Sequence, residues 1–447
     1  MPKRLMVTLV VLVLAGCAGS SLFQPYPSRM VPVKQALEQG NSQSALAQLE
    51  PGLSGSDALL YAQESGRVAA LGGDTAASQT FYREAMAQYS RYDWKAIVSL
   101  TDLTAQVGGS TVSDNLIPYH GQAYERVMVH QQQSLNYLWQ GDLEGALVEV
   151  RRADQAQTES LKAYQDALKS TRAIENAAVD AELNELDKQA GKAPNSFINA
   201  YVLMSNAALY EANGQPNDAL IDIRKALQVY PDNRMLQREL VRLSCQLRID
   251  CDELTQRYGD PVLPSAGQGR LVVLYEAGFL PARDSVFIPF TWDGLYQQVA
   301  LPTYRAGGPE PTPLSLNVGG THLTTEPVAD LDAMAARALR EQYPFILLRQ
   351  GIRLTAKHNA NRWAERKGGD LGAITMEVFN ALTEQADKRS WLTLPRQAQA
   401  WAGFIDAGEY PVTVGSENTS ITLSPGRTTV LWIARQGGLT RIQSILI

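Results

Sequence analysis

The stretch NGQPNDALIDIRKALQVYPDN covers residues 213–233 and contains the clearest pattern in the chain. In it, Gly214, Ala219, Ala226 and Pro231 stand at offsets of 0, 5, 12 and 17. The same frame recurs upstream at matching offsets: Gly141, Ala146 and Ala153; Gly73, Ser78 and Ala85; and Gly40 and Ala45, with Gly52 at the second small position. This recurrence indicates internal repeats.

The offsets resemble those of the tetratricopeptide repeat, in which a glycine closes the first helix, alanines let two helices pack closely, and a proline ends the second. Gly40 and Gly73 are 33 residues apart, close to the ~34-residue unit. Gly73 and Gly141 are 68 residues apart, which leaves room for one degenerate unit. The resemblance implies an all-α solenoid over residues 31–258.

An insertion lengthens the spacing between Gly141 and Gly214 to 73 residues. Residues 153–190 contain neither proline nor glycine, and their apolar residues recur at mostly helical intervals. We therefore expect a long helix over about 153–190. Packing against the solenoid is favoured over a coiled-coil arm that contacts a partner, because no heptad pattern is sustained.

Stacked helical pairs present a concave groove, which usually takes peptides or protein segments. The repeat frame places one set of residues near this inner surface, as candidate contacts of a partner: Gln131, Leu135, Tyr201, Met204 and Glu211. Ordinary packing is the alternative for each of them, because apolar residues at helical spacing most often belong to a core.

The pattern changes period after residue 258. The stretch YGDPVLPSAGQGR, residues 258–270, is rich in glycine and proline and predicts a linker over 259–269. Short β-rich runs follow, then helical signals from Asp330 to about Gln385, then further strands to the end. The sequence therefore predicts a multidomain chain in which an α+β domain with a mixed or antiparallel sheet occupies residues 270–447.

The first residues carry an export signal. Lys3 and Arg4 precede an apolar run that is too short to span a membrane, and Leu14, Ala15, Gly16 and Cys17 follow. These four residues resemble the lipobox of bacterial lipoproteins, which implies a signal peptide over 1–16, acyl chains such as palmitate on Cys17, and a lipidated tether over 17–30. A plain signal peptide is the alternative. Ala18 in place of aspartate implies an outer-membrane lipoprotein that faces the periplasm.

The two remaining cysteines, Cys245 and Cys251, lie six residues apart in SCQLRIDC. An even pair in an oxidising compartment predicts a disulfide, provided that the helix ends between them. Two separate buried thiols are the alternative.

Composition and motifs argue against several functions. With 40 basic and 46 acidic side chains the net charge is −6, which does not favour nucleic acid as a partner. Nucleophile, zinc and phosphate-loop motifs are missing, and the four histidines are scattered: His120, His130, His322 and His358. We expect no enzyme, metal or cofactor. A glycan hydrolase would need a carboxylate pair, for which the candidates are Glu276, Glu310, Asp387 and Asp406.

Three stretches, ADKRSWLTLP at 386, YEAGFLPAR at 275 and GEYPVTV at 408, resemble an uncharacterised family of tetratricopeptide-like lipoproteins of Gram-negative bacteria. The resemblance implies a setting near small lipoproteins similar to activators of penicillin-binding proteins. We therefore expect an anchored periplasmic scaffold that binds envelope protein or peptide partners. Alternatives are a secretion or pilus assembly lipoprotein, and a peptidoglycan-binding or remodelling protein with exposed aromatics among Trp391, Trp401 and Trp432. For Trp391 a buried plug between helices and sheet is favoured.

Overall fold

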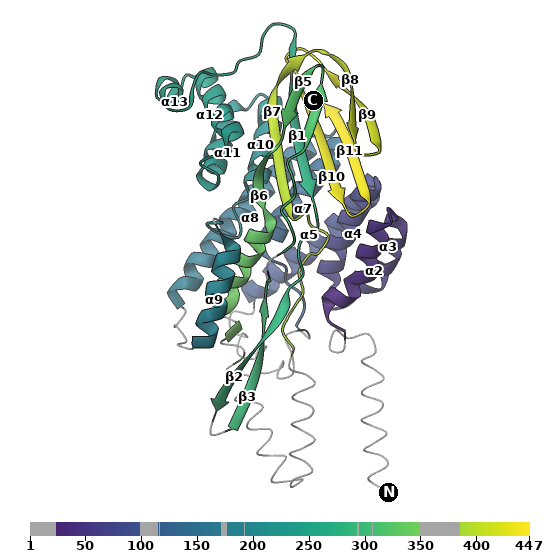
Figure 1. The fold of residues 1–447 in the computed structure, drawn as a ribbon, viewed down its shortest axis with the longest axis vertical. Coiled ribbons are helices and arrows are strands. Elements are labelled where there is room, and N and C mark those ends of the chain that lie inside the picture. The colour runs from purple at the N-terminus through teal and green to yellow at the C-terminus, as the bar shows by residue number, and fades with distance from the viewer. Residues whose placement is uncertain are drawn as a thin grey trace.

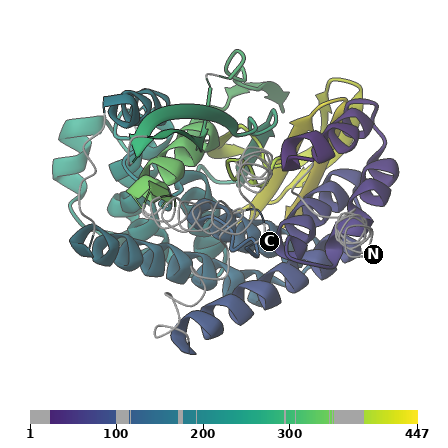
Figure 2. The same cartoon turned by 90° about the horizontal axis from the view of Figure 1, so that it is seen from below.

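A computed structural model gives the arrangement of the chain in two parts, a helical region followed by an α+β region with a mixed sheet (Figure 1). It describes residues 24–98, 115, 117–170, 177–191, 193–292, 295–305, 307–344, 346–347, 350 and 385–447. The predicted fold class is confirmed. The helices run as an arc, and the sheet lies inside its curve (Figure 2).

The helical region is built from antiparallel pairs. They are α2 (Tyr26–Glu38) with α3 (Ser42–Leu49), α4 (Ala58–Gly72) with α5 (Thr75–Val98), α7 (Ala123–Trp139) with α8 (Leu143–Ser170), α10 (Ala200–Ala212) with α11 (Pro216–Val229), and α12 (Arg234–Leu247) with α13 (Cys251–Tyr258). A short 3₁₀ helix, η1 (Glu50–Leu53), precedes α4, and α9 (Ala177–Ala190) follows α8.

The repeat glycines explain where the first helices end. Gly40, Gly73, Gly141 and Gly214 all have φ between 72° and 82°. Each amide bonds to the carbonyl three residues back, and the next amide bonds to the carbonyl five residues back, as in Gly141 N to Leu138 O and Asp142 N to Tyr137 O. This backbone favours glycine, because a Cβ is strained in the left-handed region.

The small residues of the repeat frame lie where paired helices touch. All are fully buried: Ala45, Ser78, Ala85, Ala146, Ala153, Ala219 and Ala226. A Cβ on Gly66 of α4 would lie 2.7 Å from the ring of Tyr82 on α5, so this pair packs backbone against ring. The alanine positions thus set the close approach of the helices, as the repeat pattern predicts.

The segment predicted as one long helix is helical in its described parts. Helix α8 runs from Leu143 to Ser170 and α9 from Ala177 to Ala190, while residues 171–176 lie outside the described residues. Residues 99–114 and 116, which form part of the room left for a degenerate unit, also lie outside them. Ala156 and Leu186 are buried in the main core, so both helices pack against the body.

The α+β region is organised around a five-stranded sheet with the order β11-β10-β1-β7-β6. Its strands are β1 (Gln268–Ala277), β6 (Glu326–Asp330), β7 (Gln397–Asp406), β10 (Thr428–Gln436) and β11 (Leu439–Leu446). The central strands β1 and β10 are parallel, and the other pairs are antiparallel. Three hairpins add β2 (Asp284–Trp292) with β3 (Leu295–Thr303), β4 (Ser315–Val318) with β5 (Thr321–Thr324), and β8 (Gly408–Val414) with β9 (Glu417–Leu423).

Both faces of β1 are buried, because the sheet is the middle of three layers. Val272 and Leu274 face the main core with the helices, whereas Leu271 and Val273 face a second core beneath hairpins β4–β5 and β8–β9. This alternation follows from the two-residue period of a strand. The main core combines residues of both regions, so the helices and the sheet form one body. The last helix ends at Tyr258 and the first strand begins at Gln268, so the change of secondary structure does not divide this core.

Within the described part of the chain, no helix is both long enough and apolar enough to cross a membrane.

Candidate functional site

The residues expected to line an open groove contact the chain's own sheet and helices instead. Gln131, Leu135, Tyr201 and Met204 are buried. The Tyr201 hydroxyl donates to Glu276 of β1 at 2.7 Å, and the Gln131 amide donates to Ser205. In this structure these side chains are internal contacts, and a separate partner cannot reach them.

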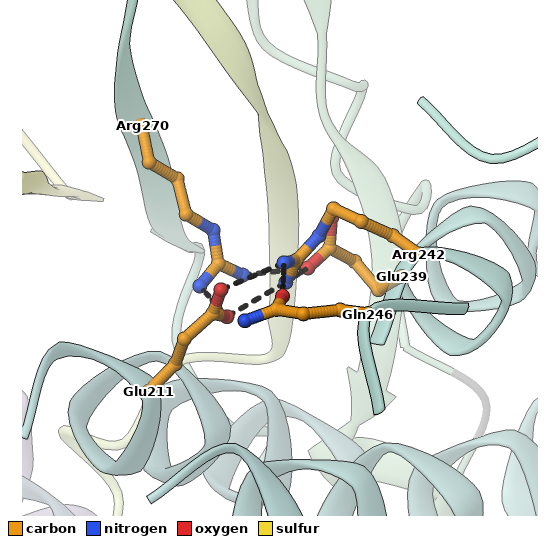
Figure 3. A network of polar contacts seen from close by, with 5 residues as sticks. All are labelled: Glu211, Glu239, Arg242, Gln246 and Arg270. Carbon is orange, nitrogen blue, oxygen red and sulfur yellow. Dashed lines mark hydrogen bonds and ion pairs between the residues drawn. The ribbon is translucent and has the colours of Figure 1, made fainter. Parts of the chain in front are cut away.

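Glu211, the fifth residue of that set, belongs to a network that joins three elements (Figure 3). Arg242 of α12 donates to Glu211 of α10 from both terminal guanidinium nitrogens at 2.7 Å and also donates to Glu239, one turn earlier on α12, at 2.7 Å. Arg270 of β1 binds the same two carboxylates, at 2.5 Å to Glu239. The alternation of charge ties the start of the sheet to the last helices of the repeat region.

The charges in this network are mutually stabilising. Burial alone would raise the pKa of Glu239, but Arg242 and Arg270 outweigh it and hold that pKa at about 2. Glu239, Arg242 and Arg270 are almost fully buried, so removing one of them leaves an uncompensated charge away from water.

A second ion pair lies deeper, between α4 and the sheet. The guanidinium of Arg67 lies 2.5 Å from a carboxylate oxygen of Glu276, and both side chains are fully buried. Arg67 also donates to Gln436 of β10 at 2.6 and 2.9 Å, and Gln132 of α7 donates to Glu276 at 2.9 Å. The guanidinium carbon lies 5.6 Å from the centroid of the Trp432 ring. Helices α4 and α7 and strands β1 and β10 therefore meet at one polar centre.

A third junction is made by two buried carboxylates that accept consecutive backbone amides. Glu64 of α4 accepts from the amides of Leu392 at 2.7 Å and Thr393 at 2.9 Å, and Glu125 of α7 accepts from the amide of Trp391 at 2.8 Å. Burial raises the pKa of Glu64 to about 7 and also raises that of Glu125. The two helices together hold the segment 391–393 before it enters β7.

Tryptophan 391 is fully buried at this junction, and its ring centroid lies 5.9 Å from that of Tyr82. The prediction that Trp391 plugs the seam between helices and sheet is confirmed. Trp432 is also buried, and Trp401 is partly buried against the second core. Stacked exposed aromatics, which a glycan-binding module would need, are therefore not formed by these three residues.

Arg389 extends the same junction. Its guanidinium donates to Asp57, before α4, at 2.7 Å, to the Ile117 carbonyl at 2.8 Å, and to Asp387 at 2.8 Å. Asp57 also pairs with Arg29 of α2 at 3.1 Å. The chain Arg29–Asp57–Arg389–Asp387 therefore links the first helix to the last third of the sequence.

The predicted disulfide between Cys245 and Cys251 is present, with an S–S distance of 2.07 Å. It joins the end of α12 to the start of α13. The helix ends between the cysteines because Arg248 and Asp250 take φ values of 59° and 54°, in the left-handed region. None of the residues of α13 is fully buried, so the bond holds a helix that few apolar contacts secure.

The candidate carboxylates for hydrolysis have other partners. Glu276 pairs with Arg67 and Asp387 with Arg389, while Asp406 accepts from Gln268 at the exposed start of β1 and Glu310 is exposed in a loop. A pair of free carboxylates is not brought together among these four residues.

Metal-ligand groups of three or more His, Cys, Asp or Glu residues do not occur in the ranges that the structure describes. Among the four histidines, buried His130 contacts Glu149 at 2.7 Å, His322 lies on β5, His120 packs against Tyr92, and His358 lies outside the described residues. The lipobox residues Leu14, Ala15 and Gly16, the lipidation site Cys17 and the first half of the predicted tether, residues 17–23, also lie outside them. The second half is not a free tether, because α2 already begins at Tyr26.

Sequence reasoning missed Glu64, Arg67 and Glu125. The available signal was that charged residues interrupt runs of small and apolar residues, as in ALLYAQESGRVAALG of α4. Such interruptions on a helix that is otherwise buried on all sides indicate buried, paired charges.

No known protein-family model matches the chain, and no curated protein matches it. The role of the three junctions follows from their geometry alone: each ties the repeat helices to the sheet or to the segment that leads into it.

Proposed function

We propose that the chain is a lipid-anchored periplasmic scaffold that binds protein or peptide partners in the cell envelope and regulates peptidoglycan synthesis. Three features support this proposal: the lipobox-like end at Cys17, the disulfide between Cys245 and Cys251, which suits an oxidising compartment, and the paired helices of a repeat-like region.

The closed interface between helices and sheet is the observation that best supports the scaffold. Arg67, Glu276, Glu239 and Arg270 are buried ion-pair partners that join the two regions, so the regions move as one body. A rigid body on a tether suits a scaffold that sets the distance between partners. Because the sheet occupies the concave side of the helices, a partner binds the outer surface, where Val148 of α8 and Ile221 of α11 are exposed.

Photo-crosslinking in living cells tests this function. A photoreactive amino acid at Val148 or Ile221 should capture a penicillin-binding protein or its lipoprotein activator, identified by mass spectrometry. The same amino acid at buried Leu135 is the matched control and should capture neither. Cys17→Ala should lose the acyl chains, the membrane fraction and the crosslink. Capture of wall glycan without protein at either exposed position would contradict the scaffold and favour a peptidoglycan-binding protein.

A further inference from the structure

Helix α2 is the first described helix, and it contacts more than its repeat partner. Five of its residues are buried: Tyr26, Met30, Val33, Ala36 and Leu37. Its start lies nine residues after Cys17, a span of at most about 30 Å even when fully extended. A lipid on Cys17 would therefore hold the first turn of α2 close to the membrane.

One route from α2 to the C-terminal region passes through Glu64. The Tyr26 hydroxyl donates to a Glu64 oxygen at 2.8 Å, and the Leu392 amide donates to the same oxygen at 2.7 Å. The ring of Tyr26 packs edge-on against Tyr61, which fixes the direction of the hydroxyl. Tyr26 and segment 391–393 thus share one buried carboxylate.

A second route passes through the connection between β1 and β2. The Lys34 ammonium donates to the Leu280 carbonyl at 3.2 Å, and the Leu280 amide donates to the Leu394 carbonyl at 2.9 Å. Both routes therefore end on residues 392–394, one from the first residue of the helix and one from its second half.

The end of α2 reaches the C-terminal hairpin as well. The Gly438 amide donates to the Leu37 carbonyl at 3.2 Å, and a Cβ on Gly438 would lie 2.1 Å from the Glu38 carbonyl oxygen. Only glycine permits this approach of the β10–β11 turn to α2. The first helix thereby contacts two segments of the α+β region directly, at Leu280 and Gly438, and it is linked to 392–394 through Glu64 and Leu280.

We propose that α2 is a strap through which the membrane tether is coupled to segment 391–394. This inference rests on the proposed lipid anchor at Cys17. Helix ends fray readily when nothing restrains them, and a held tether reduces that fraying. Anchoring therefore stabilises the hydrogen bond from Tyr26 to Glu64. Through Glu64 it also stabilises the backbone that leads into β7.

Hydrogen exchange of the mature, unlipidated Cys17→Ala chain tests the strap itself. In Tyr26→Phe the ring is kept and one donor to Glu64 is lost, so the amides of 391–393 should exchange about tenfold faster. Tyr258→Phe, in α13 far from this junction, is the matched control and should leave them unchanged. Unchanged exchange in α12 shows that the variant is folded. Exchange at 391–393 equal to that of the parent chain would overturn the strap.

The same measurement on the lipidated chain tests the coupling. In vesicles of phosphatidylethanolamine and phosphatidylglycerol, the amides of 391–393 should exchange at least about twofold more slowly than in the unlipidated chain, and those of α12 equally fast. Equal rates at 391–393 would overturn the coupling. Mass spectrometry of the N-terminal peptide separates the two proposals: an unmodified Cys17 would refute the lipid anchor, whereas the Tyr26→Phe result still decides the strap.

Discussion

The contacts between paired helices and the contacts between helices and sheet are both buried and contain apolar residues, but different features accompany those residues. Between paired helices, small residues such as Ala146 and Ala219, and Gly66 against the ring of Tyr82, allow a close approach. Between helices and sheet, ion pairs such as Arg67 with Glu276 lie beside the apolar core. Small apolar residues pack against many kinds of neighbour, whereas a buried charge is stable only when it faces its oppositely charged partner.

The difference explains what each kind of contact contributes. Alanine packing makes each helical pair a standard unit that the next pair can repeat. The ion pairs are specific to their positions, because each joins one particular helix to one particular strand. Substitutions at either kind of contact test this difference.

Arg67→Met should have the largest effect. It leaves Glu276 buried without its counter-charge, so the free energy of unfolding should fall by about 3–5 kcal/mol in urea titrations. Lys188→Ala removes one partner of the exposed ion pair with Glu185 and should change the free energy of unfolding by less than about 0.5 kcal/mol. Equal losses in the two variants would show that burial does not distinguish the pairs.

Acid should weaken the helix–sheet interface through Glu239. Its folded-state pKa of about 2 lies below the ordinary value of 4.5, so its contribution is fully present above about pH 4.5 and is lost as the pH falls toward 2. The full loss amounts to about 3 kcal/mol at ~1.4 kcal/mol per pKa unit. About 2 kcal/mol of this loss falls between pH 5.5 and 3, where urea unfolding measures it. Glu239→Gln should unfold with a shallower dependence on pH, and an unchanged slope would refute the assignment.

Gly66→Ala tests the close packing of a helical pair. Its Cβ would meet the ring of Tyr82 at 2.7 Å, so the pair must separate, at a cost of about 2 kcal/mol. Gly308→Ala is the control, because its nearest neighbour lies 4.0 Å away. Thermal unfolding compares the two. If Gly66→Ala is as stable as Gly308→Ala, the helices are not held at the distance described.

Asp74→Ala should have the smallest effect, at the turn of one repeat. The Asp74 carboxylate accepts from the Ala77 amide at 2.9 Å and caps α5, so its loss should cost about 1 kcal/mol. Gln215, at the matching position before α11, forms no side-chain cap. Gln215→Ala should therefore be close to neutral in the same urea titration, and a cost equal to that of Asp74→Ala would argue against capping.

Much of the helical region could be predicted because its signals are local. The glycine that ends a first helix acts on the turn next to it, and the small residue five positions later acts at one helix contact. The structure confirms both in the four frames, with alanine at the small position in three of them and Ser78 in the fourth. The disulfide could be predicted from compartment and spacing. The sequence could place the groove residues on inner helices, but it could not predict what covers them. The sheet that covers Tyr201 lies more than sixty residues further along the chain.

The three junctions could not be predicted either, because their partners are also far apart in the sequence. Glu64 meets Leu392, and Arg67 meets Gln436, across separations of 328 and 369 residues. A single sequence contains no sign of which distant amide a glutamate will accept from.

Periodicity, glycine, proline and cysteine act over short stretches, so the paired helices, the change to strands after residue 258 and the bonded cysteines follow from the sequence alone. The tertiary structure was needed to show that β1 pairs with β7 and β10, that the sheet lies inside the curve of the helices, and that buried ion pairs join the two. Burying a charge costs desolvation free energy, and this cost is offset only when folding brings an oppositely charged partner from elsewhere in the chain.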